Sequence, residues 1–416
     1  MTRDHRRIRV LTLTDLYPSP RRPVLGAFVE RQVRSVSDQC EATVVVFIRV
    51  FPGLRLWRRL FHPGQFISGL REWIAEVRTI PHRALRHGIR VHYKRYTSLP
   101  RQIFHGVWGL FSYAFTRAYL IALHREERFD LIHAHYASPA GVTALLAKAA
   151  MRIPIVVSVH GDDITYTARQ NAVSRWIVKQ VLTRADRVIV HSRWTATAVS
   201  ALQVPSSRIR LVHLGADVPQ CEPTDVRRER CSEDVCRLLS VGYLIPRKGH
   251  KYVIRALGEL VRRGYALEYV VVGDGPCRSE LMALAREEGV SECVRFAGEV
   301  APDELSPYYD GCDIFVLPSV SEPFGLVFIE ALAFGKPVIA CEGTGGPEDL
   351  AALGDCVALV QPHDVRSLAN TLSALMADPQ RCMKMGERGR KVVRSHYSWG
   401  VTANELCGVY REMINT

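Results

Sequence analysis

The chain has 416 residues, 47% of them hydrophobic and 23% charged, which is an ordinary composition for a soluble globular protein. This length exceeds what one hydrophobic core usually supports, so two domains are expected. The longest apolar run, residues 107–123, contains Arg117 and several polar groups, which argues against a transmembrane helix. The apolar part of residues 1–15 is too short for a signal peptide and predicts a β-strand instead. We therefore expect a cytoplasmic protein.

The charge is divided unevenly along the chain. Residues 1–215 contain 33 Lys and Arg against 13 Asp and Glu, a balance of +20; the remainder contains 22 against 29, a balance of −7, and the two sum to +13. Such asymmetry indicates a negatively charged partner for the first half, either nucleic acid or an anionic membrane. No helix-turn-helix, zinc-finger, RRM or KH signature is present, which disfavours nucleic acid.

The cysteines predict neither a disulfide framework nor a zinc site. There are 11, an odd number, and no CxxC pair. Cys231 and Cys236 are close in sequence, but no His or Cys cluster follows them. We expect most of the cysteines to be reduced and buried.

Apolar β-like runs alternate with amphipathic helical stretches along the whole chain, which is typical of parallel α/β sheets. In the first half the predicted strands are residues 10–14, 42–48, 131–135, 155–159 and 187–191. In the second half they are residues 237–242, 268–272, 313–317 and 337–341. Residues 217–233, rich in charge and proline, predict the linker between two Rossmann-like domains. Such domains bind ligands at the carboxyl ends of their strands.

Between Arg49 and Ile74, aromatic side chains are interleaved with arginines, including Trp57 and Arg58. This pattern suits the interface of an anionic membrane. A peripheral contact with the inner face of the membrane through residues 49–74 is our hypothesis. The alternative is an ordinary packed loop with surface arginines.

Several histidines lie at predicted strand ends of the first half. His133 and His135 are two apart on one strand, so their side chains face the same side. They suggest metal ligation, but no third ligand is evident, and we prefer structural polar positions. His160 ends the next strand and is followed by Asp163.

In the second half, a loop after the strand at residues 237–242 contains Arg247 and Lys248. A fixed cation there can stabilise negative charge on a departing phosphate; the alternative is a solvated basic loop. Gly273 ends a strand in a glycine turn, but Ser279 occupies the third glycine position of a GxGxxG fingerprint. We expect this turn near a nucleotide.

The most informative stretch, residues 321–337, reads SEPFGLVFIEALAFGKP. A helix is predicted from Phe324 to Phe334, ending at Gly335, with Glu322 on the turn before it and Glu330 about two turns inside. The N–H groups of Phe324, Gly325 and Leu326 are expected to point out of the helix start and bind an anion. Two carboxylates beside an anion site suit a sugar nucleotide; the alternative is two solvated residues of an amphipathic helix.

This stretch resembles the E-x7-E motif of retaining GT-B glycosyltransferases, most closely those of family 4. The resemblance extends over nearly the whole chain and implies two Rossmann-like parallel-sheet domains facing across a cleft. It implies an N-terminal acceptor domain at residues 1–216 and a C-terminal donor domain at residues 217–395. The C-terminal helix, residues 396–416, is expected to cross back onto the first domain.

The resemblance also implies roles for individual residues. Glu322 and His160 are expected to position the donor sugar, and Glu330 to hold the ribose of the nucleotide. Lys248 matches the lysine of the family's phosphate-binding loop. The family's earlier arginine is replaced by Tyr243, so Arg247 is the substitute. Gly26 matches the glycine loop that approaches the donor phosphates.

The implied activity is a retaining, metal-independent transfer of a sugar from a UDP- or GDP-type donor to a hydroxyl. No cofactor is implied. The first domain looks most like bacterial exopolysaccharide and teichuronic-acid transferases, so the expected acceptor is a cell-surface glycan or a lipid-linked glycan. Two alternatives remain: a sugar-nucleotide 2-epimerase of the same fold, or a non-catalytic member that binds nucleotide.

Overall fold

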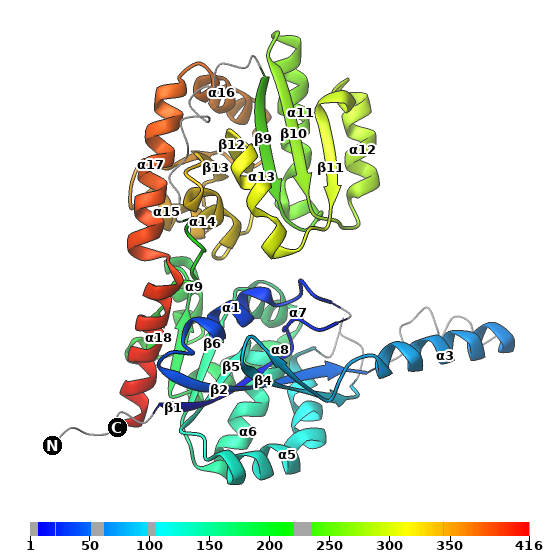
Figure 1. Cartoon of the computed structure of the whole chain (residues 1–416), viewed down its shortest axis with the longest axis vertical. Helices are drawn as coiled ribbons and strands as arrows, with labels where there is room; N and C mark the ends of the chain where they lie inside the picture. Colours follow the sequence, from blue (N-terminus) through cyan, green and yellow to red (C-terminus); the bar gives the residue numbers. More distant parts are fainter. Residues whose placement is uncertain are drawn as a thin grey trace. The chain divides into compact units, whose positions relative to one another are not determined.

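The computed structural model describes residues 7–20, 22–50, 62–98, 105–219, 235–343 and 345–415, and these residues form two compact units. Unit 1 contains Met1–His191, Thr195–Val212 and Ala403–Thr416. Unit 2 contains Ser192–Trp194 and His213–Thr402. The chain therefore returns to unit 1 at its C-terminal end (Figure 1).

Within the described residues, unit 1 contains an eight-stranded sheet in the order β3-β4-β2-β1-β5-β6-β7-β8. All pairings are parallel except that of β3 with β4. The strands are β1 (Ile8–Thr14), β2 (Cys40–Arg49), β3 (Arg83–Arg86), β4 (Ile89–Tyr96), β5 (Leu131–His135), β6 (Ile155–Val159), β7 (Arg187–Val190) and β8 (Ile209–Leu211). The α-helices that lie wholly or mostly in unit 1 are α1 (Ala27–Ser35), α3 (Pro63–Arg78), α5 (Trp108–Glu127), α6 (Val142–Met151), α7 (Ala168–Gln170), α8 (Ala172–Arg184), α9 (Arg193–Ser200) and α18 (Trp399–Ile414).

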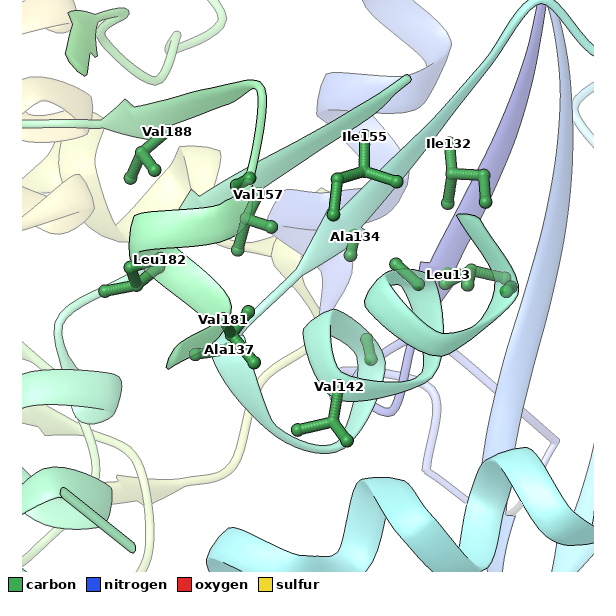
Figure 2. Close-up of a cluster of buried hydrophobic side chains, with 14 of the residues drawn as sticks. Leu13, Ile132, Ala134, Ala137, Val142, Ile155, Val157, Val181, Leu182 and Val188 are labelled. Atoms are coloured by element: carbon green, nitrogen blue, oxygen red, sulfur yellow. The ribbon is translucent and has the colours of Figure 1, made fainter. Parts of the chain in front are cut away.

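The core of unit 1 lies on both faces of this sheet because successive side chains of a strand point to opposite sides. Leu13, Ile132 and Val157 pack on one face against α6 and α8, as Figure 2 shows. Val10 and Leu131 pack on the opposite face, together with the α18 residues Ala403, Leu406, Cys407, Val409 and Tyr410. The last helix of the chain thus completes the core of unit 1.

Unit 2 contains a fully parallel six-stranded sheet in the order β11-β10-β9-β12-β13-β14 among the described residues. Its strands are β9 (Val235–Val241), β10 (Ala266–Val272), β11 (Val294–Gly298), β12 (Ile314–Leu317), β13 (Val338–Cys341) and β14 (Val357–Val360). Its α-helices are α11 (His250–Arg262), α12 (Arg278–Glu287), α13 (Ser306–Gly311), α14 (Leu326–Ala333), α15 (Gly346–Ala351), α16 (Val365–Met376) and α17 (Pro379–His396).

Alternate residues of the central strands of unit 2 enter two separate cores. Leu238 and Val316 pack with α11 and α16, whereas Leu239 and Phe315 pack with α14 and α17. Both faces of the sheet are therefore buried, which explains why its strands read as continuous apolar runs rather than as alternating ones.

All nine strands predicted from periodicity are present, and the α/β class is confirmed. The hairpin of β3 and β4 was not predicted, because its arginines and histidines hide the apolar alternation. The signal that could have revealed it is the two-residue turn of His87 and Gly88, which both have positive φ angles, 48° and 78°. The predicted linker falls largely on residues 220–234, which lie outside the described residues.

Candidate active site

In unit 2, Glu322 lies in the loop that joins β12 to α14, and contacts with the next loop hold its main chain. The Gly346 N–H donates a hydrogen bond to the Glu322 carbonyl oxygen (3.0 Å), and Glu322 forms an isolated bridge with Gly345. Glu322 is only 8% exposed. The structure therefore presents this carboxylate from a well-anchored turn at the carboxyl edge of the sheet, and a solvated surface position is ruled out.

Helix α14 begins at Leu326, two residues later than predicted, because Gly325 adopts a left-handed conformation (φ 81°, ψ 61°) at its N-cap. A Cβ atom on Gly325 would lie 2.3 Å from the ring of Phe328, so only glycine fits. Phe324 lies before the helix. The helix start consequently offers the N–H groups of Leu326 and Val327, which have no preceding helical carbonyl as partner.

Glu330 lies about one turn into α14 rather than two, since the helix starts later. Its Oε2 atom accepts a hydrogen bond from the Tyr309 hydroxyl (2.7 Å). Tyr309 belongs to α13 and is 2% exposed. Tyr309 was missed by the sequence reasoning, because nothing in the sequence pairs a tyrosine of one helix with a glutamate of the next.

The loop after β9 brings Lys248 and Glu322 together. Lys248 Nζ forms an ion pair with Glu322 Oε2, and the two side chains are 12% and 11% exposed. The lysine stem passes over Gly242, where a Cβ atom would lie 3.8 Å from the lysine Cδ and Cε atoms. The cation predicted for the phosphates and the carboxylate predicted for the sugar therefore contact each other directly.

Arg247 contacts the main chain of the loop between β12 and α14, which carries Glu322. Its Nη1 atom donates to the Ser321 carbonyl oxygen (2.6 Å), and its own carbonyl oxygen accepts from the Val320 N–H (2.8 Å). In this arrangement Arg247 supports the peptide that carries Glu322.

Close packing against Gly242 explains why position 273 is a glycine. It has φ 133°, and a Cβ atom on it would lie 2.0 Å from the Gly242 carbonyl oxygen. The Gly273 N–H donates to the Gly298 carbonyl oxygen (2.7 Å). The loops after β9, β10 and β11 are thus in main-chain contact at the carboxyl edge of the sheet.

In unit 1, His160 follows β6 and lies among aromatic rings. Its ring centroid is 4.9 Å from that of Phe28 and 4.7 Å from that of His191. The backbone N–H of His160 donates to Asp163 Oδ2 (3.1 Å), while Asp163 Oδ1 accepts from the backbone N–H of Ala137 (2.5 Å). Burial raises the pKa of Asp163 to about 7. Asp163 therefore ties together the segments that follow β5 and β6.

His133 and His135 both point to the same side of β5, with ring centroids 4.3 Å apart. His133 shares hydrogen bonds with the Tyr410 hydroxyl (2.7 Å) and the Ser158 hydroxyl (2.8 Å). Burial lowers the pKa of His133 to about 3. Among the described residues, no group of three or more His, Cys, Asp and Glu side chains is arranged to hold a metal ion.

Gly26 is the N-cap of α1 and has φ 74°. A Cβ atom on it would lie 2.3 Å from the carbonyl carbon and oxygen of Leu16, so the loop after β1 requires glycine here. Phe28 of the same helix carries the ring that contacts His160. Through Phe28, the predicted glycine loop therefore lies next to His160 within unit 1.

Trp57 and Arg58, which were predicted to touch a membrane, lie outside the described residues. Throughout the described part of the chain, every helix is too short or too polar to cross a lipid bilayer.

Two family models match most of the chain. Residues 76–215 match the glycosyl transferase 4-like domain, and residues 223–392 match the glycosyl transferases group 1. The chain is similar to D-inositol 3-phosphate glycosyltransferase 2 of Catenulispora acidiphila, with 34% identity over 70% of this chain and 73% of the relative. It is also similar to the GDP-mannose-dependent alpha-(1-6)-phosphatidylinositol monomannoside mannosyltransferase of Mycolicibacterium smegmatis, with 30% identity over 69% of this chain and 78% of the relative.

Two solved structures share the fold. Sucrose-phosphate synthase from Thermosynechococcus elongatus has a TM-score of 0.77 at 22% identity and covers 98% of this chain and 99% of its own. Anabaena HepE in complex with UDP and glucose has a TM-score of 0.70 at 20% identity and covers 97% of this chain and 99% of its own.

Proposed function

This chain belongs to the glycosyl transferases group 1 and is a glycosyltransferase of GT-B fold, and from this membership we propose its reaction. It transfers a sugar from a nucleotide-diphosphate sugar to a hydroxyl of a cell-surface or lipid-linked glycan, with retention of configuration and without a metal ion. The observation that carries this proposal is the part-buried ion pair of Lys248 and Glu322 beside the start of α14.

The comparisons support a UDP- or GDP-type donor. One similar mannosyltransferase is named as GDP-mannose-dependent, and HepE was solved with UDP and glucose. The proposed acceptor and the proposed subtype of glycosyltransferase rest on the resemblance of the first domain to exopolysaccharide and teichuronic-acid transferases.

In the proposed mechanism, negative charge that builds on the departing diphosphate is stabilised by Lys248 and by the N–H groups at the start of α14. These groups supply the positive charge that a metal ion would otherwise provide. The sequence contains no Asp-x-Asp, the motif that holds a divalent metal ion in glycosyltransferases of the other fold. Arg247 holds the loop of Glu322 and adds positive charge. The acceptor hydroxyl attacks from the face that the leaving group departs, which retains the configuration.

The remaining roles are assigned by residue. Glu330, oriented by Tyr309, binds the ribose hydroxyls; Glu322 and His160 position the donor sugar. Gly26 lets the loop after β1 approach the donor phosphates, and Gly273 lies near the nucleotide.

The decisive variant is Glu322→Ala. We expect it to lose transfer but to keep nucleotide binding, since Glu330 and the helix start remain. Initial rates measure transfer, and the rise in melting temperature with nucleotide measures binding. The exposed Glu304 offers a matched control, Glu304→Ala, which should behave as wild type. Turnover at the wild-type rate in Glu322→Ala would refute the assignment.

The donor can be identified with the same thermal-shift measurement. A panel of UDP-, GDP- and ADP-sugars should include one that raises the melting temperature, since a ligand that binds the native state stabilises it. If the true donor is mixed with enzyme alone and yields an epimerised sugar nucleotide, the transferase proposal is wrong.

We also propose that unit 1 contacts an anionic membrane near residues 49–74. Helix α3 lends support, because Ile67 and Ile74 lie seven residues apart on one helical face and are 50% and 37% exposed. Arg71 and Arg78 share that face. Apolar side chains flanked by cations suit the interface of an anionic bilayer.

Flotation with anionic liposomes at physiological salt tests this contact. Wild type should float, and Ile67→Glu/Ile74→Glu should not. Gln65→Glu/Ser68→Glu adds the same charge elsewhere on α3 and serves as the control. The hypothesis fails if wild type stays unbound or if the two double variants float equally.

A further inference from the structure

His160 has one polar side-chain contact that the proposed mechanism does not use. His160 Nε2 lies 3.0 Å from His135 Nδ1. The two ring planes differ by 14°, and the ring centroids are 5.3 Å apart. The distance between the centroids matches the 3.0 Å contact plus the distance from each ring centre to its nitrogen. Both nitrogens therefore lie on the line that joins the two centroids. The imidazoles therefore meet edge to edge, with the hydrogen bond in the plane of both rings, which is a geometry that holds the plane of His160.

The two histidines cannot choose their tautomers independently. Burial lowers the pKa of each well below its ordinary value, so both rings are neutral and each carries one N–H. One ring must donate in the shared bond and the other must accept. Neither His135 Nε2 nor His160 Nδ1 has a hydrogen-bond partner among the residues that the structure describes. The direction of the shared bond thus decides which of these two nitrogens carries an unpaired N–H.

Burial favours one direction. If His160 donated, the unpaired N–H would lie on His135, which is the last residue of β5 and is 0% exposed. If His135 donates, the unpaired N–H lies on Nδ1 of His160. This atom is also buried, but its residue is partly exposed and follows the last residue of β6. An unpaired N–H costs most where no ligand can reach it. A residue at the carboxyl edge of a parallel sheet is where a ligand can supply the missing acceptor.

We propose that His135 is a positioning residue that donates its Nδ1–H to His160 Nε2 and so holds His160 in one plane and in the Nδ1–H tautomer. His160 then offers a hydrogen-bond donor, not an acceptor, to an oxygen atom of the donor sugar. This inference rests on the proposed role of His160 in binding that sugar.

Five variants test whether the turnover that depends on His160 also depends on His135: His160→Ala, His135→Leu, His135→Asn and the two double variants. His135→Leu removes the donor at similar volume and should reduce turnover about 100-fold, the loss that follows from a small displacement of a reacting group. His135→Asn keeps an N–H close to the position of Nδ1 and should restore most of the turnover. In the His160→Ala background, His135→Leu and His135→Asn should show the same rate, because the contact is already lost.

The outcomes separate the inference from the proposed function. If His160→Ala is impaired but His135→Leu turns over as wild type does, the inference alone is overturned. A loss in His135→Leu that persists unchanged in the His160→Ala background reflects general destabilisation and also overturns it. Wild-type turnover of His160→Ala overturns both.

A measurement on the wild-type chain tests the tautomer even if a variant does not fold. Nitrogen-15 NMR of histidine-labelled protein distinguishes the Nδ1–H from the Nε2–H form. Both His135 and His160 should be in the Nδ1–H form. A signal for His160 in the Nε2–H form would overturn the assignment.

Discussion

At the scale of single residues, the pair of Lys248 and Glu322 is the central feature of unit 2. The resemblance assigns the lysine to a phosphate and the glutamate to a sugar, and in the structure each neutralises the other. A buried ion pair contributes little net stability, but removal of one partner leaves an uncompensated charge. The pair therefore offers a way to separate stability from catalysis.

Lys248→Met is expected to lower the free energy of unfolding by about 2 kcal/mol, because it leaves the largely buried Glu322 carboxyl group without its hydrogen-bond partner. It should also lower turnover by about 100-fold, since a fixed charge at the leaving group is lost. In Lys248→Met/Glu322→Gln most of the stability should return, whereas the activity should not. Urea unfolding and initial rates measure the two effects. A double variant that regains both would show that the pair has only a structural role.

At the scale of elements, the start of α14 depends on the backbone of Gly325. The helix begins where the left-handed residue turns the chain, and the ring of Phe328 fills the space beside it. The sequence signals of Pro323 and the apolar run were correct about the existence of a helix, but the position of its first residue was set by this packing.

Gly325→Ala should destabilise the protein more than Gly264→Ala. Both positions have positive φ, 81° and 89°, so each substitution adds left-handed strain of about 1 kcal/mol. Only Gly325 has a side chain within 4 Å that must move, whereas Gly264 faces open space. Equal midpoints of urea unfolding for the two variants would contradict the role of Phe328.

Strand β5 places neutral histidines in the core of unit 1, which makes stability dependent on pH. The pKa of His133 is about 3 in the folded chain against 6.5 in an unfolded one. Between these values the unfolded chain binds more protons, so stability falls as pH falls, by about 1.4 kcal/mol per pH unit for this residue. The stability that His133 contributes is complete above pH 6.5.

The variant His133→Gln removes this titration. The difference in unfolding free energy between wild type and variant should shrink by about 1.4 kcal/mol per unit as pH is lowered from 6 to 4. Chemical unfolding at each pH measures it. A difference that is constant over this range would show that His133 is protonated in the folded chain.

At the scale of the whole molecule, the chain leaves unit 1, forms unit 2 and returns to close the core of unit 1 with α18. The helix contributes Leu406 to that core, 1% exposed, while Ile414 near its end is 42% exposed. The stability of unit 1 therefore depends on residues that are far away in sequence.

Leu406→Ala is expected to cost about 3 kcal/mol of unfolding free energy, the usual penalty for a cavity in a packed core. Ile414→Ala removes a similar volume from an exposed position and should have little effect. Urea unfolding of the full chain compares them. Similar costs for both would mean that α18 is not part of the core of unit 1.

The sequence alone predicted the class of the fold, the family and nine of the fourteen strands in the described residues, all but β3, β4, β8, β11 and β14. These features depend on local periodicity and on motifs such as E-x7-E, which can be read within a few tens of residues. The sequence could not reveal the Tyr309–Glu330 bond, the approach of Gly273 to Gly242 or the contact of His135 with His160. Each of these depends on main-chain geometry or on elements that meet only when the sheets form. Side-chain contacts across a parallel sheet join residues separated by whole crossover connections, and only tertiary packing decides which of them meet.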